Sequence, residues 1–217
     1  MKIVEATKKN FKWIIFAICA ITFTVIMCAV LKFKVLHFDT WAIDLMVNRI
    51  RRPWLTAFFK VFTFFGEAKL LIPVGFIGAL IGFFIIKDRE RSFCYIGNLI
   101  VIGGLNWIIK HIIQRSRPEL SLRLVEENSY SFPSGHAMVT TAFYGMIIYY
   151  ALRHVQSKLW RNVICISLCV LIVMIDFSRV YLGVHYLSDV LAGSLISIAY
   201  LIVAIEFARM FIFKKDA

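Results

Sequence analysis

The chain alternates long apolar runs with short polar segments. A helix needs roughly 20 mostly apolar residues to cross a bilayer, or about 17 at the short end. Six runs approach that length: residues 13–31, 70–86, 92–113, 136–152, 163–177 and 189–207. The fifth run is short, so its ends are the least defined. The pattern predicts an all-α, polytopic membrane protein built as a bundle of six transmembrane helices.

Residues 40–54, between the first two runs, mix apolar side chains with charged ones, and Pro53 lies at the end of this segment. The pattern is typical of a short helix that lies in the membrane interface and is ended by the proline. An ordinary solvated loop helix would give nearly the same pattern. The remaining segments are too short for a second domain, so we expect a single integral membrane domain over residues 1–217.

The composition is that of a membrane protein rather than a soluble one. Of the 217 residues, 60% are hydrophobic and only 18% are charged, and the mean hydropathy is +0.79. A soluble domain of this size needs a larger charged surface. The formal charge of +12 would suit a nucleic-acid partner, but cytoplasmic loop ends and cations that hold anionic groups explain it better. We expect no nucleic-acid partner and no obligate protein partner.

The distribution of basic residues bears on the orientation in the membrane. With a cytoplasmic N-terminus, the inner segments would hold 13 of the 25 Lys and Arg residues, so the count alone does not decide. The basic flank before Trp13 and the clusters at residues 87–91 and 153–161 favour cytoplasmic N- and C-termini. The first run is too long for a signal peptide and lacks a cleavage site, so we interpret it as a retained anchor.

The segment at residues 110–118, after the third run, carries the first candidate site residues. Lys110 and Arg117 are seven residues apart, which is two helical turns, so both cations would point the same way. Pro118 disfavours helix at Arg117 and would end the element there. Taken alone, a snorkelling lysine and an interfacial arginine explain this segment better than a site does.

The segment at residues 133–136, directly before the fourth run, resembles the start of a helix. Ser134 is a good N-cap, and Gly135 allows a close backbone approach. The first turn of a helix offers unpaired N–H groups and a partial positive charge, which together can cradle an anion. His136 could donate a proton to an anion bound there. Ser-Gly is also a common way to begin a helix, so this segment alone leaves both interpretations open.

The segment at residues 178–189, before the sixth run, holds a candidate catalytic pair. His185 and Asp189 are four residues apart, so on a helix they would share one face. A carboxylate that accepts from one ring nitrogen fixes the tautomer and leaves the other nitrogen free as a nucleophile. Arg179 supplies a planar fork suited to phosphate oxygens. A purely structural His–Asp pair would show the same spacing.

Together the three segments place cations, two histidines, a carboxylate and a helix N-terminus on the same side of the membrane. Phosphoryl transfer needs mainly positioning and charge neutralisation, and this set supplies both without a metal. The five cysteines lie in apolar runs, and no His or carboxylate joins them at ligand spacing. We expect a phosphoryl-transfer enzyme that uses no cofactor.

The three motifs resemble those of the type 2 phosphatidic acid phosphatase family, and also the vanadium haloperoxidases, which share that site. The matching patterns are Lys-(six)-Arg-Pro, Pro-Ser-Gly-His and Ser-Arg-(five)-His-(three)-Asp, at residues 110–118, 133–136 and 178–189. The six-run layout is similar as well, so the resemblance covers nearly the whole chain. The haloperoxidases are soluble, which makes them the weaker comparison.

The resemblance implies a catalytic role for each motif residue. His185 would attack phosphorus to give a phosphohistidine, Asp189 would orient it, and His136 would protonate the leaving alcohol and then activate water. The phosphate oxygens would be held by Lys110, Arg117, Ser134, Gly135 and Arg179. The substrate would be a membrane lipid phosphate that arrives laterally from the bilayer, namely phosphatidylglycerol phosphate, phosphatidic acid or undecaprenyl diphosphate. The compact chain is similar to bacterial members of the family.

The alternative from another class is a transporter or binding protein for an anionic lipid, which could use the same cationic pocket. It would not need two histidines and a carboxylate around one pocket. His111 neighbours Lys110 but would point about 100° away on a helix, so we leave it out of the site. We expect Glu126 and Glu127 to lie on a solvated loop face.

Overall fold

The computed structural model describes residues 2–211, with side chains for residues 10–210, and within this range the chain is helical and forms no strand. The all-α prediction is therefore confirmed. In chain order the elements are α1 (Lys2–Phe33), α2 (His37–Ile43), a π-helix (Asp44–Ile50), α3 (Pro53–Phe64), α4 (Ala68–Leu80), a second π-helix (Ile81–Ile85), α5 (Arg89–Ile113), a 3₁₀ turn (Leu120–Leu122), α6 (Gly135–His154), α7 (Lys158–Tyr181) and α8 (Leu187–Phe211).

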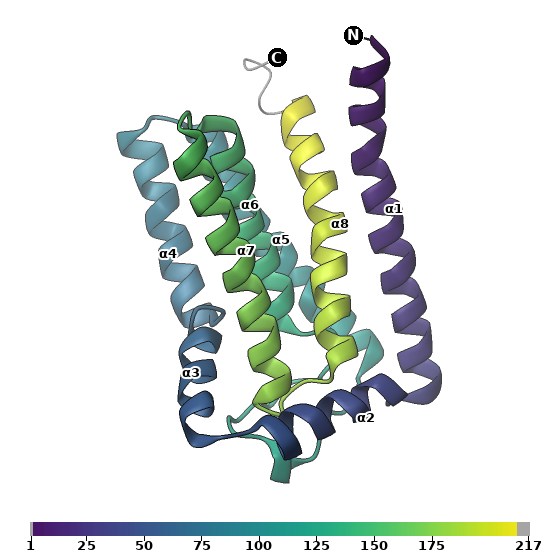
Figure 1. Ribbon diagram of the computed structural model, residues 1–217. Coiled ribbons are helices and arrows are strands. Elements are labelled where there is room, and N and C mark those ends of the chain that lie inside the picture. Colours follow the sequence, from purple (N-terminus) through teal and green to yellow (C-terminus); the bar gives the residue numbers. More distant parts are fainter. Residues whose placement is uncertain (1, 212–217) are drawn as a thin grey trace.

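The long helices form one bundle around α6, which packs against α5, α7 and α8. On the outside, α1 packs on α8, α4 on α5 and α3 on α7 (Figure 1). Helix α2 lies across one end of the bundle, which we call the α2 end. Helix α1 begins and α8 ends at the other end, which we call the opposite end (Figure 1).

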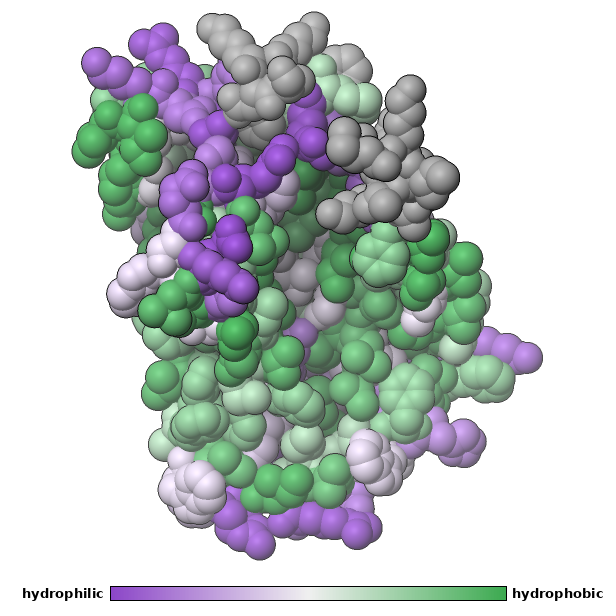
Figure 2. All heavy atoms as spheres, turned by 45° about the horizontal axis from the view of Figure 1, so that its top comes forward, coloured by the Kyte–Doolittle hydropathy of each residue, from purple (hydrophilic) through white to green (hydrophobic). Residues whose placement is uncertain are grey.

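Five helical segments are long and apolar enough to cross a membrane: Asn10–Phe33, Pro53–Ile85, Arg89–Ile113, Lys158–Tyr181 and Leu187–Met210. Large apolar side chains on their outer faces are exposed, as on α1 at Ile14, Ile18, Ile21 and Val25. Figure 2 shows hydrophobic residues over the middle of the visible face and hydrophilic residues gathered toward the two ends. The chain is thus a multi-pass membrane protein.

The predicted run at residues 136–152 lies within α6, which is not among these five segments. Polar residues such as His136, Thr140 and Thr141 lower its hydropathy, and Thr140 and Thr141 are buried among the neighbouring helices. Helix α6 therefore has other helices rather than lipid as its main neighbours.

The region between the first two predicted runs differs in detail from the expected helix at residues 40–54. Helix α2 and the π-helix that continues it run from His37 to Ile50. Pro53 does not end this element but is the first residue of α3, where its missing N–H costs no hydrogen bond. The sequence interpretation missed α3, which leads into α4 through a turn at residues 65–67 (Figure 1).

Candidate active site

The three motif segments meet at the α2 end of the bundle. Lys110 lies in the last turn of α5, Arg179 in the last turn of α7, and Asp189 in the first turn of α8. Ser134 caps α6, and Gly135 and His136 are its first residues. The remaining two residues, Arg117 and His185, lie in loops. Residues separated by up to 79 positions thus form one cluster, as the sequence predicted.

His185 and Asp189 form a buried pair. The side chain of His185 is 2% exposed and that of Asp189 is 0% exposed, and His185 Nδ1 lies 3.4 Å from Asp189 Oδ2. His185 precedes α8, which begins at Leu187, so the two residues do not share a helical face as predicted. They meet because Asp189 Oδ2 reaches back over the start of the helix, where it accepts from the Tyr186 N–H at 2.9 Å.

Ser131 completes the contacts of this carboxylate oxygen. Its Oγ donates to Asp189 Oδ2 at 2.5 Å and lies 3.4 Å from His185 Nδ1. On the other side of the ring, His185 Nε2 lies 3.1 Å from Arg117 Nη1. The carboxylate side therefore favours a proton on Nδ1, which leaves the Nε2 lone pair facing the arginine cluster.

The surroundings of His185 keep its imidazole neutral. Burial is the main reason that the pKa of His185 lies well below its ordinary value, and the positive charges of Arg117, Lys110 and Arg179 lower the pKa further. A neutral imidazole carries the lone pair that a nucleophile needs. The site thus contains an oriented neutral histidine beside several cations.

Arg117 reaches the site from a loop rather than from a helix. Helix α5 ends at Ile113, and Gln114 adopts a left-handed conformation (φ 48°), so the prediction of helix up to Arg117 is wrong. The side chain is held in place because it donates to Val184 O at 2.8 Å and to Ser129 O at 2.6 Å. Burial lowers the pKa of Arg117 to about 10, so the guanidinium remains charged at neutral pH.

Arg179 and Lys110 supply two more buried cations. Arg179 is 2% exposed and donates through Nη1 to Thr63 Oγ1 at 2.7 Å, while its Nε has no hydrogen-bond partner among the described residues. Lys110 is 7% exposed and donates to the Tyr130 and Ser131 carbonyl oxygens. Buried cations of this kind are costly unless an anion accompanies them.

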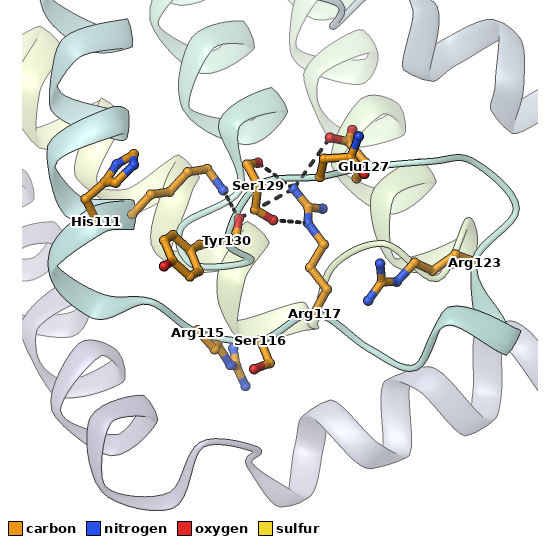
Figure 3. Close-up of a pocket in the computed structure, with 10 residues that line it drawn as sticks. His111, Arg115, Ser116, Arg117, Arg123, Glu127, Ser129 and Tyr130 are labelled. Atoms are coloured by element: carbon orange, nitrogen blue, oxygen red, sulfur yellow. Dashed lines mark hydrogen bonds and ion pairs between the residues drawn. The ribbon is translucent and has the colours of Figure 1, made fainter.

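An anion from the chain itself lies on this cluster. Glu127 pairs with Arg179 through Oε1, and its Oε2 lies 3.5 Å from Arg117 Nη2. The expectation that Glu127 lies on a solvated loop face is therefore wrong. Its carboxylate bridges the two guanidinium groups that were predicted to hold phosphate, and Figure 3 shows it beside one of them, that of Arg117. No spacing in the sequence signals this contact, since Glu127 belongs to an irregular loop.

His136 lies at the start of α6, where Ser134 Oγ accepts from the Ala137 N–H at 3.4 Å. The His136 Nε2 atom is buried and has no hydrogen-bond partner among the described residues. The turn between α3 and α4 covers the ring closely, because a Cβ at Gly66 would lie 2.8 Å from His136 Cδ2. Any side chain larger than glycine there would push on this histidine.

The start of α6 is joined to the start of α8 by backbone contact. The Ser134 N–H donates to Asp189 O at 3.0 Å. A Cβ at Gly193 would lie 2.9 Å from Ser134 O, so glycine permits the two helices to approach this closely. The two motifs that supply His136 and Asp189 are thereby held together.

A cavity of about 540 Å³ opens beside the cluster, and Figure 3 shows Arg117, Glu127, Ser129 and Tyr130 converging on it. His111 also lines this cavity. Its Nδ1 lies 2.8 Å from Trp107 O, and its ring lies 5.8 Å from that of Tyr130. His111 is thus at the edge of the site, although the sequence interpretation left it out.

Comparison with known proteins identifies the family. The profile of the PAP2 superfamily matches residues 91–213. The chain is 34% identical to phosphatidylglycerophosphatase B of Bacillus subtilis over 79% of this chain and 84% of that protein. It is 31% identical to human dolichyldiphosphatase 1 over 61% of this chain and 60% of that protein. The chain therefore belongs to the PAP2 superfamily.

Two solved structures resemble the fold. The crystal structure of a transmembrane PAP2-type phosphatidylglycerolphosphate phosphatase from Bacillus subtilis matches with a TM-score of 0.79 and 30% identity, over 90% of this chain and 96% of that one. Aquifex aeolicus LpxE matches with a TM-score of 0.59 and 23% identity, over 80% of this chain and 98% of that one, and shows the fold alone. With relatives that are phosphatases, the chain is a lipid phosphatase of this superfamily.

Proposed function

We propose that this protein hydrolyses a phosphate monoester or diphosphate of a membrane lipid through a covalent phosphohistidine on His185, without a metal ion. One observation carries the proposal. The buried His185 ring has Nδ1 on the Asp189 carboxylate and Nε2 toward the guanidinium of Arg117, 3.1 Å away. A neutral, oriented nucleophile next to a cationic cluster suits attack on a phosphate.

In the first step, His185 Nε2 forms a bond to phosphorus as the bond between phosphorus and the leaving oxygen breaks. His136 gives a proton to that oxygen, so the lipid leaves as an alcohol or, from a diphosphate, as a monophosphate. Arg117, Arg179 and Lys110 neutralise the charge on the phosphate oxygens. The backbone N–H groups after Ser134, beginning at Gly135, add the partial positive charge of the start of α6.

In the second step, His136 takes a proton from water as the water oxygen attacks the phosphohistidine. The bond between phosphorus and His185 Nε2 breaks, inorganic phosphate leaves, and the imidazole is neutral again. Asp189 holds the ring throughout and stabilises the positive charge that builds up on it. Protons balance over the two steps, since His136 is the acid in the first step and the base in the second.

The proposal needs no metal because three cations already surround the phosphate position. We expect full activity in excess EDTA, and inhibition by orthovanadate as a mimic of the five-coordinate transition state. The measurement is release of inorganic phosphate from purified protein in detergent. Loss of activity in EDTA that Mg²⁺ restores would contradict the metal-free scheme.

In the membrane, we propose six spans, with α6 as the span in addition to the five apolar segments, and with α2 in the interface. The α2 end would face the extracytoplasmic side, and the lipid would reach the site laterally from the bilayer. The basic clusters at residues 87–91 and 153–161, at the opposite end, support this orientation.

Labelling of an engineered cysteine tests the orientation. A Ser121→Cys variant, with the natural cysteines replaced, should react with an impermeant thiol reagent added to intact cells. Ser121 is exposed in the loop at the α2 end. A cysteine placed in the same background at Ser157, in the turn between α6 and α7, is the matched control and should react only after permeabilisation. The reverse labelling pattern would show the opposite orientation in the membrane.

The candidate substrates are phosphatidylglycerol phosphate, phosphatidic acid and undecaprenyl diphosphate. Phosphatidylglycerol phosphate is supported by the name of the Bacillus subtilis relative, phosphatidylglycerophosphatase B. A polyprenyl diphosphate is supported by the name of the dolichyldiphosphatases. The deciding experiment compares kcat/KM for the three lipids with purified protein in detergent. If the purified protein hydrolysed none of the three lipids, the proposal would be contradicted.

A further inference from the structure

Arg115 lies within the first motif segment, at one of the six positions between Lys110 and Arg117 that the motif does not specify, yet it contacts the catalytic carboxylate. Its side chain is 2% exposed. Nη1 donates to Asp189 Oδ1 and, at 2.7 Å, to Ser188 Oγ. Nη2 lies 2.7 Å from Asp39 Oδ2, and Nε donates to Lys34 O at 2.8 Å. Every nitrogen of this guanidinium group therefore has a partner.

Asp39 holds Arg115 from the other side. It is fully buried in α2, and it accepts from the Ser188 backbone N–H through Oδ1 and from Ser188 Oγ through Oδ2, both at 2.8 Å. The Tyr186 ring lies against the same guanidinium group, with its centroid 4.2 Å from Arg115 Cζ. Arg115 is thus fixed by groups from α2, from the end of α1 and from the start of α8.

The two oxygens of Asp189 have separate partners. Oδ2 is shared by His185, Ser131 and the Tyr186 N–H, and Oδ1 faces Arg115. A carboxylate held at one oxygen can still rotate about the bond between Cβ and Cγ. Contacts at both oxygens fix its plane, and the plane determines where Oδ2 meets the imidazole.

We propose that Arg115, anchored by Asp39, is a positioning residue that sets the orientation of Asp189 and through it the tautomer and ring position of His185. This inference rests on the proposed phosphatase function. Arg115 lines the edge of the cavity (Figure 3), but the proposal assigns it no contact with substrate, because Nε, Nη1 and Nη2 are already engaged by groups of the protein. Loss of Arg115 should therefore lower kcat and leave KM nearly unchanged.

The cost of such a network supports a functional reason for it. One cation and two carboxylates are buried together, and buried charges often contribute little or nothing to stability compared with apolar side chains of the same size. Groups that orient metal-ligating side chains typically change affinity or activity by about 10–100-fold when removed, and Arg115 orients Asp189 in the same manner. We expect a loss of that order for Arg115→Gln.

The test is a double-mutant cycle measured as kcat and KM on the best lipid substrate. Arg115→Gln should lower kcat by about 10–100-fold with KM within about twofold of the parent protein. In an Asp189→Asn background the same substitution should change the residual kcat by less than about twofold, because the residue on which Arg115 acts is already altered. Arg115→Lys, which keeps the charge but not the fork, should lie between parent and Arg115→Gln.

Arg49→Gln is the matched control. Arg49 also pairs with an aspartate, Asp44, at 2.7 Å, but its side chain is 73% exposed and belongs to the π-helix after α2. The Arg49→Gln variant should retain the kcat and KM of the parent protein. If Arg115→Gln does not fold, Asp39→Asn carries the same cycle, with an expected fall in kcat of about 3–10-fold that disappears in the Asp189→Asn background.

The outcomes separate the two proposals. An active parent protein with unchanged kcat in Arg115→Gln would overturn the positioning role alone. The positioning role would also be overturned if Arg115→Gln lowered kcat by the same factor in the Asp189→Asn background as in the parent protein. A rise in KM with constant kcat would overturn it as well. A parent protein that releases no phosphate from any lipid would overturn the proposed function, and the positioning role with it.

Discussion

The two ends of the bundle use arginine in different ways. At the α2 end, Arg115 and Arg179 are both 2% exposed and are held by aspartate, glutamate and hydroxyl partners. At the opposite end, Arg89 and Arg153 are exposed and lie against aromatic rings, at 5.0 Å from Phe83 and 5.9 Å from Tyr149. The α2 end thus holds arginines in its interior besides exposed ones such as Arg49, whereas Arg89 and Arg153 lie on the surface.

The difference has an energetic meaning. An exposed charge is solvated, costs little and contributes about 0–1 kcal/mol when paired. A buried charge must recover its lost hydration from specific partners, so removal of one partner is expensive. Exposed arginines such as Arg89 and Arg153 can act through charge alone, as in membrane topology, whereas buried ones such as Arg115 and Arg179 depend on geometry.

The largest effect that we expect is from His185→Ala. It should abolish turnover and any acid-labile phosphoenzyme, because it removes the proposed nucleophile, His185 Nε2, which lies beside Arg117. Phosphate release and trapping of radiolabelled phosphoenzyme measure this. His185→Asn adds a control for packing and for the rival function, since a lipid transporter would keep its activity with asparagine there. An active His185→Ala protein would remove the covalent scheme.

The next effect concerns His136→Ala, and it depends on the substrate. A general acid contributes about 10²–10⁴-fold when the leaving group is a poor one and matters less when that group is already acidic. A lipid alkyl phosphate should therefore lose more rate than p-nitrophenyl phosphate. The ratio of kcat/KM for the two substrates is the measurement. Equal losses on both, together with an active His185→Ala, would require the two histidine roles to be exchanged or the scheme to be dropped.

The smallest effect should come from the opposite end. Arg153→Gln removes an exposed charge that contacts no catalytic residue, so kcat/KM should stay at the parent value and stability should change by no more than about 0.5 kcal/mol. The same substitution at the buried Arg179 should lower kcat/KM strongly, because it removes a cation of the phosphate site. Phosphate release and thermal unfolding in detergent give both comparisons. Similar losses of kcat/KM at both positions would contradict the contrast between buried and exposed arginines.

The motif residues could be predicted because their spacing is short and chemically specific. Ser134 and His136 lie at a helix start that the sequence indicates, and His185 and Asp189 are only four residues apart. The long apolar runs likewise define the main helices. In each case the information is local, so it can be taken directly from neighbouring residues.

Local information fails where the structure joins distant segments. Asp39 and Arg115 are 76 residues apart, and they meet only in the folded chain, where α2 packs against α8. The left-handed conformation of Gln114, which ends α5 early, belongs to a residue type with no strong preference for it. Pro53 suggests the end of a helix because proline interrupts helices, yet proline is also favoured at the first position of a helix, where it lies here.

Glu127 has a consequence for any ligand of this site. Its carboxylate already lies between Arg117 and Arg179, so an incoming phosphate must replace an anion rather than fill an empty cationic pocket. The measured affinity is then a difference between the affinities of two anions for the same pair of arginines. Binding becomes an ion exchange, in which a phosphate with two charges and three oxygens has the advantage over a tethered carboxylate with one charge and two.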